Sequence, residues 1–378
     1  MLDAVAGHAW NPAAPLAKGQ RTIGGVFVNW RPDWDGHSAV AANTNIGTTG
    51  VSDAAAGAAS RHDPLDDLLI LRVLDTYLAT GAHSAPMDQL RCELSPIVAQ
   101  EFARYGVDRA WIYGQLIALG QLDSGGAWLS DARDYADLLA RSYIDPIAGA
   151  ERDPRTGAYR SDNAAEVAGA LADAGHRFGR PDWLSIAAKA AAYLVTRAAN
   201  PVTGLFPGTL TVTTGGTQDV VGDPLVKVGS QAQLLDALLS VYDQTGDHSL
   251  LTAVQRAAVS LDSPAIGLAD PRAGGYFYAA DASGTRIRTS YKETRQAWML
   301  PLWRHLVRDG VTGAGQVSAL DAFVRDGLFR AGGDGFAYRV APDLSTFVSN
   351  GNDTTVREDF ISTEATGIAV VALLGPLS

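Results

Sequence analysis

Apolar residues recur at spacings of three and four residues along most of the chain from residue 63 onward, with polar residues between them. This spacing predicts amphipathic helices that each bury one face. The pattern therefore predicts an all-α protein. About eleven segments follow it, at residues 64–79, 87–104, 109–121, 127–142, 163–178, 182–198, 228–244, 248–261, 291–308, 314–328 and 360–374.

The connections between these helices alternate between tight and long after the second helix. Each tight connection carries the Gly or Pro that ends a helix, and so predicts a helical hairpin, at residues 122–126, 178–181, 245–247 and 309–310. The long connections leave from equivalent ends of the hairpins, at residues 143–161, 199–226, 262–289 and 329–359. Repeated hairpins of this kind predict a closed ring, with inner helices that begin near residues 63, 109, 162, 227, 291 and 359.

Related sequences open the long connections and form an irregular internal repeat. Three of them read Asp-Pro-Arg-Thr-Gly-Ala-Tyr, Asn-Pro-Val-Thr-Gly-Leu-Phe and Asp-Pro-Arg-Ala-Gly-Gly-Tyr, at residues 153–159, 200–206 and 270–276, with a looser version at 333–338. Asp-Pro or Asn-Pro starts a turn, the Gly adopts the left-handed conformation, and the aromatic residue enters a short strand.

The hairpins, such as Ala-Leu-Leu-Ser-Val-Tyr-Asp-Gln-Thr-Gly-Asp at residues 237–247, resemble those of the six-hairpin (α/α)6 toroid superfamily. That superfamily contains inverting glycosidases, unsaturated glucuronyl hydrolases, polysaccharide lyases and sugar 2-epimerases. The resemblance covers residues 63–374 and implies a toroid with short β-hairpins in the long loops of one face, where the inner helices begin and the sugar binds. The predicted organisation is a non-helical leader, residues 1–62, packed on a single toroid domain, residues 63–378.

Composition excludes several classes of protein. With 47% hydrophobic and 19% charged residues the chain is globular. A net charge of -11 and the absence of a Lys or Arg run argue against nucleic acid as a partner. No apolar stretch reaches the roughly 18 residues of a membrane helix. The single cysteine, Cys92, excludes an internal disulfide and is predicted to fill the core. We expect a monomer with a carbohydrate substrate.

Residues 1–20 lack the charged and then apolar segments of a signal peptide. Their Ala, Gly and Pro content also fits a secreted chain after signal removal, so a secreted or cell-envelope location is favoured and a cytoplasmic one is possible. No His, Asp and Glu spacing predicts a metal site, and no phosphate loop is present, so no cofactor is expected. Four histidines, at positions 8, 176, 248 and 305, are predicted to be exposed.

Two groups of candidate substrate-binding residues lie near the start of the chain. In the leader, Trp30, Trp34 and Asp35 suit the apolar face and the hydroxyls of a sugar ring, or the leader is a strap that fills the place of a twelfth helix. At the first inner helix, Asp63 fits an N-cap, which leaves His62 and Asp67 as candidates.

Further candidates stand where other inner helices begin. Arg160 and Asp162 precede a helix of small residues that leaves room for a ligand, although Asp162 also fits an N-cap. Lys227 and Gln231 are expected to donate hydrogen bonds to substrate. The densest polar set is Tyr291, Lys292, Glu293, Arg295 and Gln296. These side chains cannot all face solvent, because the next turns of the predicted helix are apolar. Ser290 and Glu293 also have the spacing of a capping box, which would make Glu293 structural.

The last inner helix supplies Asp359 and Glu364. Thr355 and Glu358 also have capping-box spacing, which makes Glu358 a weaker catalytic candidate. Glu364 lies in an Ala and Gly rich helix, where a buried carboxylate needs a partner.

The leading hypothesis is a glycoside hydrolase that inverts a poly- or oligosaccharide linkage with two carboxylates, since the resemblance implies that glycosidases of this fold mostly invert. Asp162 is the predicted general acid and Asp359 or Glu364 the base, with Glu293 able to take either role. Such a pair is expected roughly 6.5 to 9.5 Å apart. Alternatives are a lyase or epimerase, in which His62 or Tyr291 abstracts a proton beside Lys292 and Arg295, and a non-catalytic glycan-binding toroid.

Overall fold

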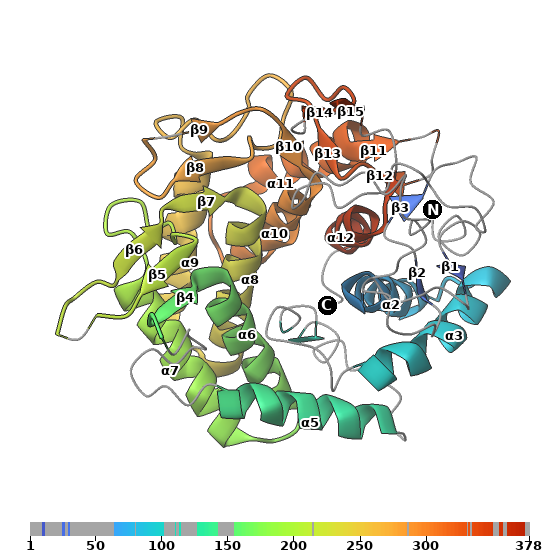
Figure 1. Ribbon diagram of the computed structural model, residues 1–378, viewed down its shortest axis with the longest axis horizontal. Coiled ribbons are helices and arrows are strands. Elements are labelled where there is room, and N and C mark those ends of the chain that lie inside the picture. The colour runs from blue at the N-terminus through green and yellow to red at the C-terminus, as the bar shows by residue number, and fades with distance from the viewer. Residues whose placement is uncertain are drawn as a thin grey trace. The chain divides into compact units, whose positions relative to one another are not determined.

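The computed structural model describes residues 10–11, 25–26, 29–30, 64–79, 81–101, 110, 113–114, 127–142, 155–213, 215–285, 287–330, 332, 335–350, 355–357 and 361–374. These residues are mainly helical, as the sequence pattern predicts (Figure 1). None of the described helices is long and apolar enough to cross a membrane.

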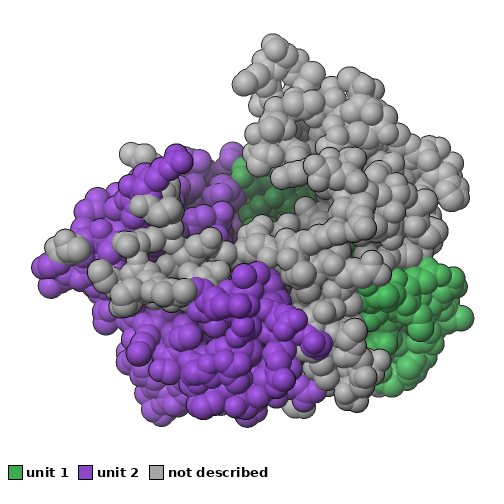
Figure 2. Space-filling model, turned by 60° about the horizontal axis from the view of Figure 1, so that its bottom comes forward, with its two compact units in different colours: residues 1–101, 291–297, 321–378 green, residues 102–290, 298–320 purple. Residues whose placement is uncertain are grey.

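The chain divides into two compact units, which Figure 2 shows in different colours. Unit 1 comprises residues 1–101, 291–297 and 321–378, and unit 2 comprises residues 102–290 and 298–320. The predicted boundary after residue 62 stays a prediction, because residues 31–63 lie outside the described part of the chain.

Unit 2 is built from helical hairpins. Its helices are α5 (Ala127–Ser142), α6 (Ser161–Arg177), α7 (Pro181–Arg197), α8 (Val228–Thr245), α9 (His248–Asp262) and α10 (Met299–Arg308), followed by α11 (Ala314–Ala322), which ends in unit 1. Helix α6 packs against α7 and α8, and α8 also packs against α9 and α10 (Figure 1). Nearly every residue at the start of α6 and α8 is buried, whereas α7 and α9 bury one face. Helices α6 and α8 are thus the inner helices of their hairpins, as predicted.

A glycine lets the two inner helices approach each other closely. A Cβ added to Gly169 of α6 would lie 2.9 Å from the carbonyl oxygen of Ala237 in α8. The small residues that the sequence places along α6 therefore serve helix packing as well as any space for a ligand.

The tight connections have the predicted chemistry. Gly179 follows α6 with a φ of 63°, and Gly246 caps α8 with a φ of 71°. Asp247 then caps α9, since its side chain accepts a hydrogen bond from the Ser249 amide. In the repeated loop sequences, Gly157, Gly204 and Gly274 all have positive φ, which confirms the predicted left-handed positions.

The long loops of unit 2 carry two antiparallel sheets. One has the order β4–β5–β6, from Ala158–Arg160, Thr209–Thr211 and Val220–Asp223, and the other the order β7–β8–β9, from Leu225–Lys227, Ala279–Asp281 and Ile287–Arg288. Strand β4 precedes α6, while β5 and β6 belong to the loop that precedes α8. The sheets therefore join successive long loops at the ends where the inner helices begin.

Unit 1 centres on α2 (Pro64–Ala79), which packs against α3 (Ala85–Glu101) and α12 (Thr363–Leu374). Unit 1 also contains a π-helix at Phe323–Leu328 and all but the last residue of a 3-10 helix at Thr294–Trp298. Its short strands are β1 (Trp10–Asn11), β2 (Gly25–Val26), β3 (Asn29–Trp30), β10 (Lys292–Glu293), β11 (Phe329–Arg330), β12 (Gly335–Phe336), β13 (Arg339–Val340), β14 (Val348–Asn350), β15 (Thr355–Arg357) and β16 (Ile361–Ser362). They pair as β1–β2, β3–β16, β10–β13, β11–β12 and β14–β15.

Several sequence-based expectations are wrong in detail. The predicted helix at 291–308 begins only at Met299, because Lys292 and Glu293 pair with Val340 and Arg339 instead. The predicted capping box of Ser290 and Glu293 is therefore not formed. The last helix begins at Thr363 rather than near 359, and Thr355 lies in a strand.

Three more residues differ from their predicted surroundings. Asp162 lies in the first turn of α6, whose N-cap is Arg160, so it is not the helix cap. Cys92 is exposed on α3 rather than part of the core. His305 has a side chain that is only 12% exposed, and it lies against Asp243 of α8 and against Asp309, which follows α10.

Candidate functional site

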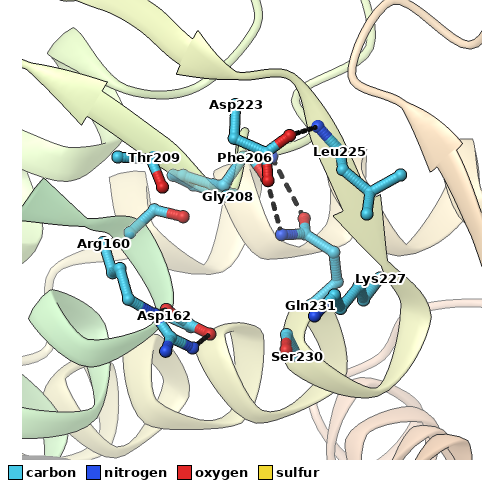
Figure 3. Close-up of a pocket in the computed structure, with 11 residues that line it drawn as sticks. Arg160, Asp162, Phe206, Gly208, Thr209, Asp223, Leu225, Lys227, Ser230 and Gln231 are labelled. Atoms are coloured by element: carbon cyan, nitrogen blue, oxygen red, sulfur yellow. Dashed lines mark hydrogen bonds and ion pairs between the residues drawn. The ribbon is translucent and has the colours of Figure 1, made fainter. Parts of the chain in front are cut away.

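A polar cavity of about 210 Å³ lies in unit 2 where α6 and α8 begin. Strands β4, β5, β6 and β7 complete its wall. In Figure 3, Arg160 and Asp162 line one side and Lys227, Ser230 and Gln231 line another, with Asp223 near the backbone of Gly208. Four of the predicted site residues, Arg160, Asp162, Lys227 and Gln231, thus share one cavity.

Asp162 is held by a two-pronged contact with Arg160. Arg160 donates from Nε to Oδ1 at 3.0 Å and from Nη2 to Oδ2 at 2.6 Å. The Asp162 side chain is 11% exposed, whereas that of Arg160 is 59% exposed. A bidentate arginine is the usual environment of an ionised carboxylate, and it fixes the orientation of the group.

The same arrangement, in which Nε and Nη2 of one arginine bond to both oxygens of an aspartate, recurs at the start of α7, away from the cavity. We call this arrangement an arginine fork. Arg180 is the N-cap of α7, and it donates to Asp182 from Nε at 2.8 Å and from Nη2 at 2.6 Å. This contact lowers the pKa of the exposed Asp182 carboxyl. The fork is therefore a local feature of these helix starts, and its place beside the cavity distinguishes Asp162.

Two other polar residues of the cavity wall are used to hold the wall together. Gln231 accepts from the Phe206 amide at 3.0 Å and donates to the Phe206 carbonyl at 2.8 Å. Ser161 donates its hydroxyl to the carbonyl of Pro207 at 2.5 Å. One of the two side-chain N–H donors of Gln231 is thus used within the protein, and its predicted role as a donor to substrate stays a prediction.

Unit 1 brings together a second charged group. Glu364, in the first turn of α12, forms an ion pair with Arg295. The predicted need of Glu364 for a partner is thereby confirmed. The negative charges of Glu364 and then Glu293 raise the pKa of Arg295. Burial raises the pKa of the nearby Tyr338 hydroxyl, and Glu293 and Glu364 raise it further.

The other predicted residues of unit 1 are largely enclosed by protein. Lys292 is 0% exposed, with its Nζ 5.6 Å from the centre of the Phe323 ring, and Gln296 is 2% exposed. These values confirm that this polar set does not face solvent as a whole. Tyr291 stacks near the guanidinium of Arg339 at 4.8 Å. Asp67 is also 0% exposed, so contact of Lys292 or Asp67 with a substrate would require rearrangement.

Several candidates lie outside the described residues: Trp34, Asp35, His62 and Asp359. Trp30 is described through its backbone, which pairs with Ile361 in front of α12. The role of the leader, as a sugar-binding segment or as a strap in place of a twelfth helix, stays a prediction.

Asp243, His305 and Asp309 form a cluster that the sequence spacing did not predict. Their potential ligand atoms lie within 4.8 Å of one another at the carboxyl ends of α8 and α10. Arg308 contacts both carboxylates, Asp243 at 3.1 Å and Asp309 at 3.0 Å. The guanidinium group of Arg308 therefore already neutralises part of the negative charge of this cluster.

Asp223 and Tyr338 are candidate site residues that the sequence analysis missed. Both lie in long loops rather than at helix starts, where the candidates were sought. A signal was present for Asp223, which lies four residues before the candidate Lys227. Tyr338 closes the fourth copy of the loop repeat, but no spacing connects it with Glu364.

Solved structures of carbohydrate enzymes share this fold. An unsaturated glucuronyl hydrolase from Bacillus sp. GL1 has a TM-score of 0.64 and 16% identity, over 82% of this chain and 85% of that chain. A D-mannose isomerase has a TM-score of 0.63 and 12% identity, over 99% and 95% of the two chains. An inactive variant of the α-1,6-mannanase of Salegentibacter sp. HEL1_6, in complex with α-1,6-mannotriose, has a TM-score of 0.58 and 13% identity, over 83% and 90%. No protein-family model and no curated sequence matches the chain.

These similarities establish the fold class. The relatives are (α/α)6 toroids, and the chain has the toroid fold that its hairpin pattern predicts. At identities of 12 to 16% the likeness concerns the fold and not the reaction, which must be argued from the site.

Proposed function

We propose that the protein is a glycoside hydrolase that cleaves a poly- or oligosaccharide with inversion. The observation that carries this proposal is the polar cavity at the start of α6 and α8, in which Asp162 is fixed by Arg160. The glucuronyl hydrolase and the mannanase that share the fold are named as glycan-cleaving enzymes. Two carboxylates suffice for this reaction without a cofactor.

Asp162 fits the role of the base that activates water. The Arg160 fork suits a charged carboxylate, and a base must be charged when it accepts the proton. This role differs from the general acid that the sequence alone assigned to Asp162. The mechanism also requires a general acid, for which Glu293, Asp359 and Glu364 remain the candidates from the sequence.

A screen of a glycan panel tests the proposal. We expect new reducing ends from at least one glycan and no absorbance from a new double bond. Unsaturated products would identify a lyase instead. A glycan that binds but stays intact after long incubation would contradict hydrolysis and support a binding protein.

A sugar isomerase or epimerase is the second candidate. It is favoured by the D-mannose isomerase, whose likeness extends over 99% of this chain. Such a reaction moves a carbon-bound proton, so incubation of free sugars in D₂O would introduce deuterium without releasing new reducing ends.

A further inference from the structure

The cavity at the start of α6 and α8 is lined by two charged side chains that form no ion pair with another described residue. Arg160 and Asp162 neutralise each other through two hydrogen bonds. Asp223 and Lys227 remain, on β6 and β7, and neither forms an ion pair with another described residue. Oδ1 of Asp223 accepts from the Leu225 amide at 3.0 Å, which leaves Oδ2 with free acceptor capacity.

Asp223 and Lys227 both line the cavity, Asp223 from β6 beside Gly208 and Lys227 from β7 beside Gln231 (Figure 3). The Asp223 carboxylate lies close to Gly208, since a Cβ at position 208 would stand 3.5 Å from Oδ2, an ordinary contact distance. A carboxylate accepts hydrogen bonds and an ammonium group donates them, whereas a sugar hydroxyl does both. The two side chains therefore offer a sugar in this cavity both an acceptor and a donor for its hydroxyls.

The balance of charge limits the kind of sugar. The charged residues that line the cavity are Arg160, Asp162, Asp223 and Lys227, and their charges cancel. An acidic sugar gains attraction from Lys227 but meets repulsion from Asp223, and the chain as a whole carries a net charge of -11. A neutral sugar meets no such opposition.

We infer that this cavity selects a neutral sugar residue, with Asp223 accepting hydrogen bonds from its hydroxyls and Lys227 donating to them. The inference rests on the proposed function, because it names the class of sugar that the proposed hydrolase accepts at this site. It assigns to Asp223 a role in substrate specificity.

Binding of matched neutral and acidic sugars tests this inference. The probes are the methyl glycosides of glucose, mannose and galactose, each beside the methyl glycoside of its uronic acid, titrated against the full chain and followed by ligand-observed NMR. At least one neutral glycoside should bind about tenfold more tightly than its uronate. Asp223→Asn should weaken the neutral glycoside by about tenfold and strengthen the uronate, since Lys227 is then unopposed. Lys227→Gln should weaken the neutral glycoside without strengthening the uronate.

Two variants outside the cavity serve as controls. Asp343, like Asp223, accepts from the amide two residues further on, at 3.1 Å, and Lys189 is exposed on α7. Asp343→Asn and Lys189→Gln should leave every titration unchanged. Tighter binding of the uronates by the wild-type chain, binding of none of the six probes, or an unchanged Asp223→Asn variant would each overturn the inference.

The glycoside titrations and the glycan screen together separate this inference from the proposed reaction. Cleavage of a uronic-acid polymer in the glycan screen would keep the hydrolase and overturn the neutral-sugar inference. Binding of a neutral glycoside with no glycan cleaved would keep the inference and overturn the hydrolase.

Discussion

Asp173, on the inner helix α6, is a carboxylic acid in the interior of unit 2. It is 7% exposed and lies near Ser240 and Gln244 of α8. Burial raises its pKa, and the charges of Asp236 and Asp243 raise it further. A carboxyl group with a raised pKa in the folded state favours folding below its unfolded pKa of about 3.9, and this contribution is lost as the pH rises through the folded-state value.

The variant Asp173→Asn should therefore be more stable than the wild type at pH 8 and should lose that advantage at pH 4.5. The amide keeps a hydrogen-bond acceptor and removes the buried charge, a gain on the order of 1 kcal/mol or more at the higher pH. Thermal unfolding at both pH values measures it, with the exposed Asp134→Asn on α5 as the control. An equal loss of Tm at both values would show that the carboxyl group stabilises the fold as a hydrogen-bond acceptor.

Individual site residues were predictable where a helix begins. Arg160, Asp162 and Lys227 were found from their place after a long loop and before a helix, and the structure puts them around one cavity. Asp223 was not found, because it comes into the cavity through pairing of β6 with β5. The sequence also did not reveal that the Gln231 side chain bonds to the Phe206 backbone, because the two residues meet only through tertiary structure.

At the scale of the elements, packing of α6 on α8 depends on Gly169. In Gly169→Ala the new Cβ would stand 2.9 Å from the Ala237 carbonyl oxygen, so the helices must separate, and we expect a loss of about 1 to 3 kcal/mol in the free energy of unfolding. Urea unfolding measures this. Gly315→Ala on α11 meets nothing within 4 Å and should be neutral or slightly stabilising. Equal effects of the two substitutions would contradict the close packing of the inner helices.

Helix bounds were predictable where the apolar spacing is uninterrupted. The expected helices at 64–79 and 127–142 have those bounds in the structure. The expectation at 291 failed because Lys292 and Glu293 pair with residues more than forty positions later. Periodicity along one segment contains no information about such a distant partner.

For the whole molecule, alternation of tight and long connections was the informative signal. It predicted the inner helices of unit 2 and the toroid fold, which the solved relatives share. The reaction was not predictable in the same way, because toroids with different activities have the same hairpin pattern. Loop residues such as Asp223 take their places through strand pairing and other tertiary contacts, which the hairpin pattern does not reveal.

The most direct test of the central claim compares Asp162→Asn with Asp182→Asn on the glycan that the wild-type chain cleaves. Each residue accepts two hydrogen bonds from its own arginine at the start of a helix, Asp162 from Arg160 and Asp182 from Arg180. Only Asp162 lines the cavity. We predict that Asp162→Asn lowers kcat by about 100-fold or more with glycan binding largely kept, while Asp182→Asn retains near full activity. If Asp162→Asn, Glu293→Gln, Asp359→Asn and Glu364→Gln all hydrolyse the glycan at nearly the wild-type rate, the two-carboxylate account is wrong.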